Sequence, residues 1–218
     1  MESDFWLQRW REAQTGFHQD APTPLLLEHW PAIGAPPGCR VFVPLAGKSL
    51  DMAWFASQGH QVLGAELSPL AVAQFFEGQG IAPGIRDASD GRHHVAGPIT
   101  LVQGDVFGLE ADAFQGCAAV FDRAALIALP AEMRQRYVRE VYSKLPSGCR
   151  GLLITIEFPK HERAGPPFSV DETEVRALFA DAWEVELLER RDILAQQPRF
   201  AEEGVTRLAT AAYRLRRR

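Results

Sequence analysis

The sequence predicts a single α/β domain built on a mostly parallel sheet. Short apolar runs alternate with segments of helical periodicity along the chain, which is typical of βαβ units with right-handed crossovers. The 218 residues, 46% of them apolar, suffice for one large domain with its own core. We expect residues 39–218 to form the α/β core and residues 1–38 to form a helical N-terminal lid region.

Aromatic residues recur at helical spacing in the N-terminal lid region, over residues 4–15. Trp6 and Trp10 lie on that face, and a glycine just before Phe17 then breaks the helix. Such a stripe ordinarily packs a helix on a sheet, but a tryptophan face also suits a sulfonium cation or an adenine ring. Both interpretations stay open. A second short helix is expected after Thr23, which suits the N-cap, because a proline follows it.

The α/β core is expected to alternate strands and helices. The apolar runs predict seven strands, near residues 40–45, 61–65, 99–103, 118–121, 151–158, 183–188 and 207–215. Capping and apolar patterns predict helices at residues 50–58, 68–79, 130–144 and, from a capping box at 169–172, to about 180. The segment 82–98 is rich in Gly, Pro, Asp and Arg and reads as a surface loop. No crossover helix is evident between the last two strands, so we expect them to pair antiparallel at one side of the sheet.

The most informative segment is residues 40–51, where an apolar strand ends in a glycine loop and a helix follows. A second apolar strand then ends at Glu66, 19 residues after Gly47. In nucleotide-binding α/β folds the glycine lets the backbone approach the ligand, and an acid roughly 20 residues later accepts hydrogen bonds from ribose hydroxyls. The alternative is a structural turn whose glycine serves packing alone.

This loop is not a G-x-G-x-x-G motif, because it holds one glycine and Pro44 precedes it. A pyrophosphate needs several backbone N–H groups, so a nicotinamide-dependent dehydrogenase is disfavoured. A nucleoside without phosphates fits better, and S-adenosylmethionine is the commonest such cofactor. Seven strands with a late antiparallel pair also match the Rossmann-like class I S-adenosylmethionine-dependent methyltransferase fold. The sequence therefore favours a methyltransferase, and a non-catalytic nucleoside-binding scaffold stays an alternative.

In an open α/β sheet, ligands bind beyond the carboxyl ends of the strands. Besides the glycine and the acid above, the predicted strands deliver Leu45, Asp105 and Arg123 to this edge. Leu45 is either core or an apolar wall for the ligand, and Asp105 either accepts from an adenine amino group or caps a turn. Arg123 either pairs with Asp122 or contacts a ligand through its planar fork of donors. The loop 165–168 is expected to overhang the same edge.

Composition limits the partners and the compartment. A net charge of −5 disfavours a nucleic-acid partner. The chain has no apolar run of about 18 residues and no signal-peptide pattern at its start, so we expect no membrane association and a cytoplasmic location. No long exposed apolar stripe is left over, and we expect a monomer. The cysteines form no C-x-x-C pair and precede strands, so we expect neither a metal site nor a catalytic thiol at Cys39, Cys117 and Cys149.

Taken together, these motifs resemble the bacterial branch of the thiopurine S-methyltransferase family. The resemblance runs nearly end to end and is far more specific than one glycine turn. It rests on segments 5–10, 16–18, 43–49, 64–68, 104–107, 122–126, 153–155 and 165–170.

The resemblance implies S-adenosylmethionine contacts at Trp10, Leu45, Glu66 and Arg123. It also implies that Val106 lies near the adenine and that Phe17 and Arg123 face the substrate, which makes Arg123 the candidate catalytic group. One departure is visible, since bacterial members usually carry cysteine where Ala46 stands. We expect Ala46 to be tolerated because the backbone does the binding in that loop.

The implied chemistry is an in-line displacement in which a thiol or thiolate sulfur attacks the methyl carbon of the sulfonium. The cofactor supplies the reactivity, and the protein supplies alignment and a dry site. A thiopurine sulfur is already partly anionic near neutral pH, so Arg123 would stabilise the anion without a dedicated base. The implied acceptors are aromatic and heterocyclic thiols such as 6-mercaptopurine and, for bacterial members, selenium and tellurium species in metalloid detoxification. A methyltransferase for halides or small aliphatic thiols stays the runner-up, and pocket size would separate the two.

Overall fold

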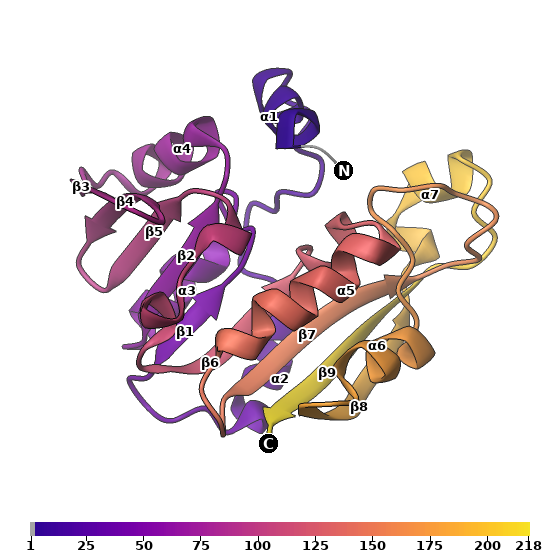
Figure 1. The fold of residues 1–218 in the computed structure, drawn as a ribbon. Helices are drawn as coiled ribbons and strands as arrows, with labels where there is room; N and C mark the ends of the chain where they lie inside the picture. The colour runs from indigo at the N-terminus through magenta and orange to yellow at the C-terminus, as the bar shows by residue number, and fades with distance from the viewer. Residues whose placement is uncertain (1–2) are drawn as a thin grey trace.

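In the computed structural model, which describes residues 3–218, nine strands form one mixed sheet. The strands are β1 (Arg40–Val43), β2 (Gln61–Glu66), β3 (Gly84–Ala88), β4 (Gly91–Ala96), β5 (Ile99–Gln103), β6 (Cys117–Arg123), β7 (Arg150–Glu157), β8 (Trp183–Asp192) and β9 (Ala209–Arg217). Their order across the sheet is β3-β4-β5-β2-β1-β6-β7-β9-β8 (Figure 1). The five strands from β5 to β7 are parallel, so their carboxyl ends share one edge.

The sequence predicted seven of these nine strands and missed β3 and β4. The prediction of a surface loop at residues 82–98 is wrong, because this segment forms an antiparallel hairpin that extends the sheet beyond β5. The hairpin lies at the edge of the sheet, and all five residues of β3 are exposed. An exposed edge strand needs no apolar alternation, so its composition resembles that of a loop.

The other end of the sheet was predicted correctly. Strand β9 runs antiparallel to both β7 and β8 and lies between them. The connection from β8 to β9 contains a five-residue helix, α7 (Pro198–Glu202), which the sequence did not indicate.

Helices cover both faces of the sheet (Figure 1). They are α1 (Ser3–Arg11), α2 (Pro24–Ile33), α3 (Leu50–Ser57), α4 (Pro69–Gln79), α5 (Ala131–Glu140), α6 (Glu172–Phe179) and α7. Strand residues alternate between two cores, as the pleat requires: Val41 and Val43 pack with α2, α3 and α4, whereas Phe42 packs with α5 and α6. Within residues 3–218, none of the helices combines the length and the apolar character that crossing a bilayer requires.

The helix starts follow the predicted caps with two exceptions. Ser49 and Ser68 cap α3 and α4, at the starts that the capping patterns predicted. Thr23 stands at the N-cap of α2, but its hydroxyl donates to the buried carboxylate of Asp51 at 3.0 Å instead of capping. At α6 the cap is Asp171, because the hydroxyl of Ser169 is already engaged with the backbone of Phe158.

Candidate active site

A cavity of about 930 Å³ lies at the carboxyl edge of the parallel strands. Its lining extends from the residues after β5 to the start of β9. All the site residues predicted from the sequence line it, namely Trp10, Phe17, Leu45, Gly47, Glu66, Asp105, Val106 and Arg123. The structure therefore brings these residues to one place, while the binding role of each stays a prediction.

The glycine loop between β1 and α3 presents its backbone to the cavity. Leu45 and Gly47 have positive φ angles of 44° and 55°. Residues other than glycine rarely adopt this backbone region. A Cβ atom at Gly47 would lie 3.2 Å from the ring of Trp10, so the missing side chain lets the tryptophan pack on the loop. The N–H of Ala46 donates to the carbonyl of Ala65 at 2.8 Å, a backbone contact that any residue at position 46 can make.

Glu66 closes β2 as a buried carboxylate. Its two oxygens accept from the backbone N–H groups of Gly47 at 2.8 Å and Ser68 at 2.7 Å. Burial raises the pKa of Glu66, and these hydrogen bonds oppose the rise. A carboxylate has about four acceptor sites, so these bonds leave acceptor capacity for a ligand's hydroxyl group. The geometry fits a ribose contact.

Asp105 and Val106 follow β5 and line the cavity next to Glu66 in the sheet order. Oδ1 of Asp105 accepts from the N–H of Phe107 at 3.0 Å and caps a short 3₁₀ turn, so the capping interpretation is confirmed. Asp105 is exposed, and the turn engages only one of its oxygens, so a contact with an adenine amino group stays a prediction. Val106 is buried and offers the cavity an apolar surface.

Arg123 ends β6 and lines the cavity without pairing with Asp122. The carboxylate of Asp122 is fully buried and accepts from two tyrosine hydroxyls at 2.9 and 3.0 Å. The Arg123 guanidinium instead donates through Nη1 to the carbonyl of Phe17 at 3.1 Å. Burial lowers the pKa of Arg123, and the charge of Asp51 opposes this. Because a guanidinium stays protonated in proteins, the cavity holds a fixed positive charge here.

Helix α1 lies over this edge of the sheet (Figure 1). The ring of Phe17 lies 5.6 Å from that of Trp10 and 6.0 Å from that of Trp6, both edge to face. Within residues 3–218, Nε1 of Trp6 and Nε of Arg9 are buried donors without a partner, and both residues line the cavity. Buried donors are costly to leave unpaired, and a ligand with acceptor atoms would satisfy them. This favours a cover over a ligand rather than packing alone.

Sequence reasoning missed most of the cavity's end near β7 and β9. The predicted overhang of the loop 165–168 is confirmed, because Pro166 and Pro167 line the cavity. The connection around α7 was not expected to contribute, yet Arg199 and Phe200 also line it. Pro198 at the first position of α7 is the one start signal, and five residues are too few to show an apolar period, so the sequence carries little signal for this wall.

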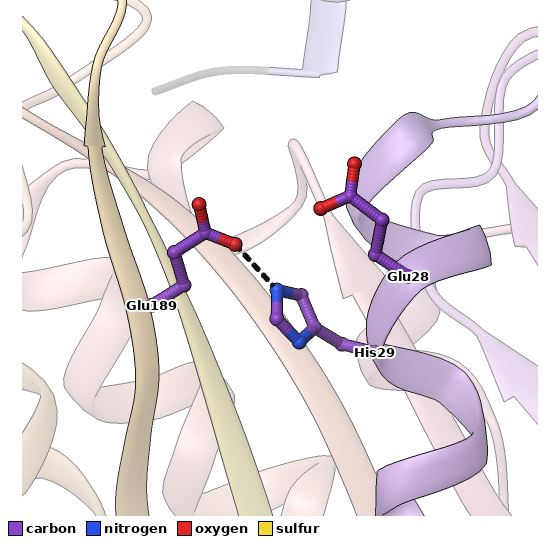
Figure 2. A group of neighbouring side chains, drawn as sticks. All are labelled: Glu28, His29 and Glu189. Atoms are coloured by element: carbon purple, nitrogen blue, oxygen red, sulfur yellow. Dashed lines mark hydrogen bonds and ion pairs between the residues drawn. The ribbon is translucent and has the colours of Figure 1, made fainter.

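A second cluster of titratable groups joins α2 to β8. His29 Nε2 lies 2.7 Å from Oε2 of Glu189, with Glu28 beside them (Figure 2). Arg191 approaches Glu28 at 2.8 Å and Glu189 at 2.6 Å. Because this guanidinium pairs with both carboxylates, the cluster is best described as an ion-pair network that ties the helix to the strand.

Comparison with known proteins extends the argument beyond geometry. The chain is 60% identical over 218 residues to a thiopurine S-methyltransferase of Xanthomonas axonopodis pv. citri, covering 100% of both chains. It is 57% identical over 217 residues to one of Bordetella parapertussis, covering 100% of this chain and 99% of the other.

Solved structures confirm the fold class. The 1,6-didemethyltoxoflavin-N1-methyltransferase of Burkholderia thailandensis, solved with S-adenosylhomocysteine, superposes with a TM-score of 0.62 at 17% identity, covering 98% of this chain and 87% of that one. An S-adenosylmethionine-dependent methyltransferase of Anabaena variabilis gives a TM-score of 0.62 at 13% identity, covering 99% and 95%. The family model described as thiopurine S-methyltransferase matches residues 1–218. The chain belongs to the thiopurine S-methyltransferase family and is a methyltransferase that depends on S-adenosylmethionine.

Proposed function

We propose that the protein transfers a methyl group from S-adenosylmethionine to the sulfur of an aromatic or heterocyclic thiol such as 6-mercaptopurine. The size of the cavity carries this proposal. Its volume of about 930 Å³ lies near the upper end of small-molecule sites, which run from roughly 300 to 1,000 Å³. A nucleoside cofactor bound at the ends of β1, β2 and β5 leaves the part of the cavity at β6, β7 and β9 for the methyl acceptor. We refer to these parts as the cofactor half and the acceptor half.

The acceptor half combines apolar walls with guanidinium groups. Its apolar lining includes Phe17, Ile154, Ile156, Phe200 and Leu208. Arg123 and Arg199 also line it, and a guanidinium suits an anionic or polarisable ring through charge and stacking. These features favour a flat heterocyclic thiol over the halides and small aliphatic thiols of the runner-up function, which need far less space.

In this proposal Glu66 accepts hydrogen bonds from the ribose hydroxyls, while Leu45 and Val106 provide apolar contacts for the cofactor. S-adenosylmethionine supplies an electrophilic methyl group on a sulfonium sulfur. Trp10 covers the cofactor half and excludes water. Arg123 stabilises negative charge on the acceptor sulfur, directly or through one water. The protein thus contributes alignment, charge stabilisation and desolvation.

We further propose a cytoplasmic monomer that acts on small molecules without a nucleic-acid partner. The net charge of −5 supports the exclusion of nucleic acid. All three cysteines are free thiols, as suits a reducing compartment. Burial raises the pKa of Cys117 to about 11 and that of Cys149 to about 12, which supports a spectator role for both. Light scattering at several protein concentrations tests the monomer.

The direct test is a product assay with S-adenosylmethionine and a panel of acceptors: 6-mercaptopurine, methanethiol, iodide and selenite. We expect kcat/KM to be highest for 6-mercaptopurine, with the S-methyl product identified by mass spectrometry. Turnover of iodide or methanethiol without the thiopurine would establish the runner-up function. Binding of the cofactor with no methylation of any of these acceptors would mean that the acceptor lies outside this panel, and the proposed thiol would be wrong. Selenite tests the metalloid acceptors that the family resemblance implies.

A further inference from the structure

Few side chains of the cavity have an atom that can serve as a general base. Among the described residues that line it, only Glu66, Asp105 and His18 can do so. Glu66 and Asp105 belong to the cofactor half, and each already accepts a backbone N–H. His18 alone belongs to the N-terminal lid region, on the side that contacts Arg123. It is the remaining candidate for a base next to the acceptor.

The backbone at His18 is held by its neighbours. Its backbone N–H donates to the carbonyl of Thr15 at 2.8 Å, which closes a turn. The preceding carbonyl, that of Phe17, accepts from Arg123 at 3.1 Å. His18 therefore follows directly on the contact between the lid and the guanidinium that is proposed to stabilise the acceptor sulfur.

The surroundings of His18 lower the pKa of its imidazole and so favour the neutral form. Burial is the largest cause that lowers the pKa of His18, and the charges of Lys48, in the glycine loop, and Arg123, at the end of β6, lower it further. Asp20, on the same segment, opposes them. A histidine whose pKa lies below its ordinary value is unprotonated at neutral pH and free to accept a proton.

We propose that His18 is the general base for acceptors that enter the cavity as neutral thiols, an inference that rests on the proposed function. The imidazole takes the S–H proton, and the sulfur electron pair forms the bond to the methyl carbon. The bond between that carbon and the sulfonium sulfur breaks, and its electron pair stays on the sulfur of S-adenosylhomocysteine. The proton then leaves to solvent, since His18 is only partly buried. An acceptor that is already ionised needs no such transfer.

The test compares two acceptors in one pair of variants. The acceptors are 6-mercaptopurine and 2-mercaptoethanol, an alkyl thiol that is less acidic than cysteine (pKa roughly 8.5) and is therefore almost wholly un-ionised at neutral pH. His18→Gln removes the base and keeps a polar side chain. We expect kcat for the alkyl thiol to fall roughly 100-fold, as for the loss of a general base, and kcat for the thiopurine to change less than about threefold. His161→Gln, a histidine with an 85% exposed side chain outside the cavity, is the matched control.

Two pH measurements separate a base from a structural residue. In the wild type, kcat/KM for the alkyl thiol should fall as the pH drops through the pKa of His18, and His18→Gln should remove that step. The imidazole of His18 can also be titrated by NMR in cofactor-free protein, where its signal is assigned because it is missing from His18→Gln. This titration should give the same pKa as the kinetics, below the ordinary 6.5.

Four outcomes would overturn the inference. They are equal losses with both acceptors, unchanged rates with both, no wild-type turnover of the alkyl thiol, and a kinetic step that differs from the NMR titration. Each leaves wild-type turnover of 6-mercaptopurine intact. If the wild type fails to methylate the thiopurine as well, it is the proposed function that has failed.

Discussion

The two halves of the cavity are held together by different kinds of interaction. The cofactor half rests on central strands, and its key carboxylate, Glu66, is buried and bonded to backbone N–H groups. The acceptor half takes much of its wall from α7 and the loop after β7. There Glu203 bridges Arg163 and Arg199 near the surface.

This difference determines how well each half of the cavity tolerates substitutions. Each buried polar group that a substitution leaves without a hydrogen-bond partner costs about 1–3 kcal/mol. A surface ion pair contributes about 0–1 kcal/mol. Substitutions in the cofactor half should therefore remove the cofactor, whereas those in the acceptor half should mainly alter which acceptor is used.

The largest effect is expected for Glu66→Ala. Loss of hydrogen bonds from the ribose to a charged acceptor, about 1.5–3 kcal/mol each, should weaken S-adenosylhomocysteine binding roughly 100-fold or more in a calorimetric titration. Glu203→Ala removes a carboxylate that pairs with two arginines of the acceptor half and is the matched control, with an expected change below about twofold. An unchanged affinity in Glu66→Ala would break the comparison, because the central carboxylate would then not bind the cofactor.

Arg123 lies where the two halves meet, and its substitution should affect turnover more than cofactor binding. We expect Arg123→Ala to lower kcat for 6-mercaptopurine by roughly 100-fold, as for the loss of one donor to a developing or fixed anion. Arg123→Lys should keep part of the rate, because the charge is retained without the planar fork. Initial rates at saturating cofactor give the answer, and wild-type turnover in Arg123→Ala would exclude the assigned role.

The same division explains what could be predicted from the sequence. Only one helix and one strand, α3 and β2, separate Gly47 from Glu66, so local patterns place both at the same edge of the sheet. Contacts between distant segments carry no such signal. The sequence does not show that Thr23 binds Asp51 or that Arg123 reaches Phe17, because each contact depends on how the lid region packs. Phe200 escaped notice for a related reason, since its helix is too short to leave a periodic pattern.

Cofactor affinity should also depend on pH through Glu66. Burial raises the pKa of this carboxyl above its ordinary value of 4.5, and the ribose contact needs the ionised form. Affinity for S-adenosylhomocysteine should therefore be fully present above the raised pKa and be lost as the pH falls through it, by about tenfold per pH unit below. Glu66→Gln should show weak binding without this step. A step in Glu66→Gln identical to that of the wild type would assign the dependence to another group.

The smallest effect is expected for a substitution next to the acceptor half. Glu203→Gln weakens the pairs with Arg163 and Arg199, so we expect KM for 6-mercaptopurine to rise about twofold to threefold, as for the loss of surface ion pairs. Cofactor affinity and the melting temperature should stay close to wild type. A loss of cofactor binding in this variant would mean that the two halves are not independent.

One titration tests the division most directly. 6-Mercaptopurine is added by calorimetry to protein saturated with S-adenosylhomocysteine, and the bound nucleoside is then quantified after rapid desalting. The account predicts one-to-one binding of the thiopurine with the nucleoside retained, because the two occupy different halves of one cavity. Displacement of the nucleoside, or no thiopurine binding to the saturated protein, would contradict a separate acceptor half.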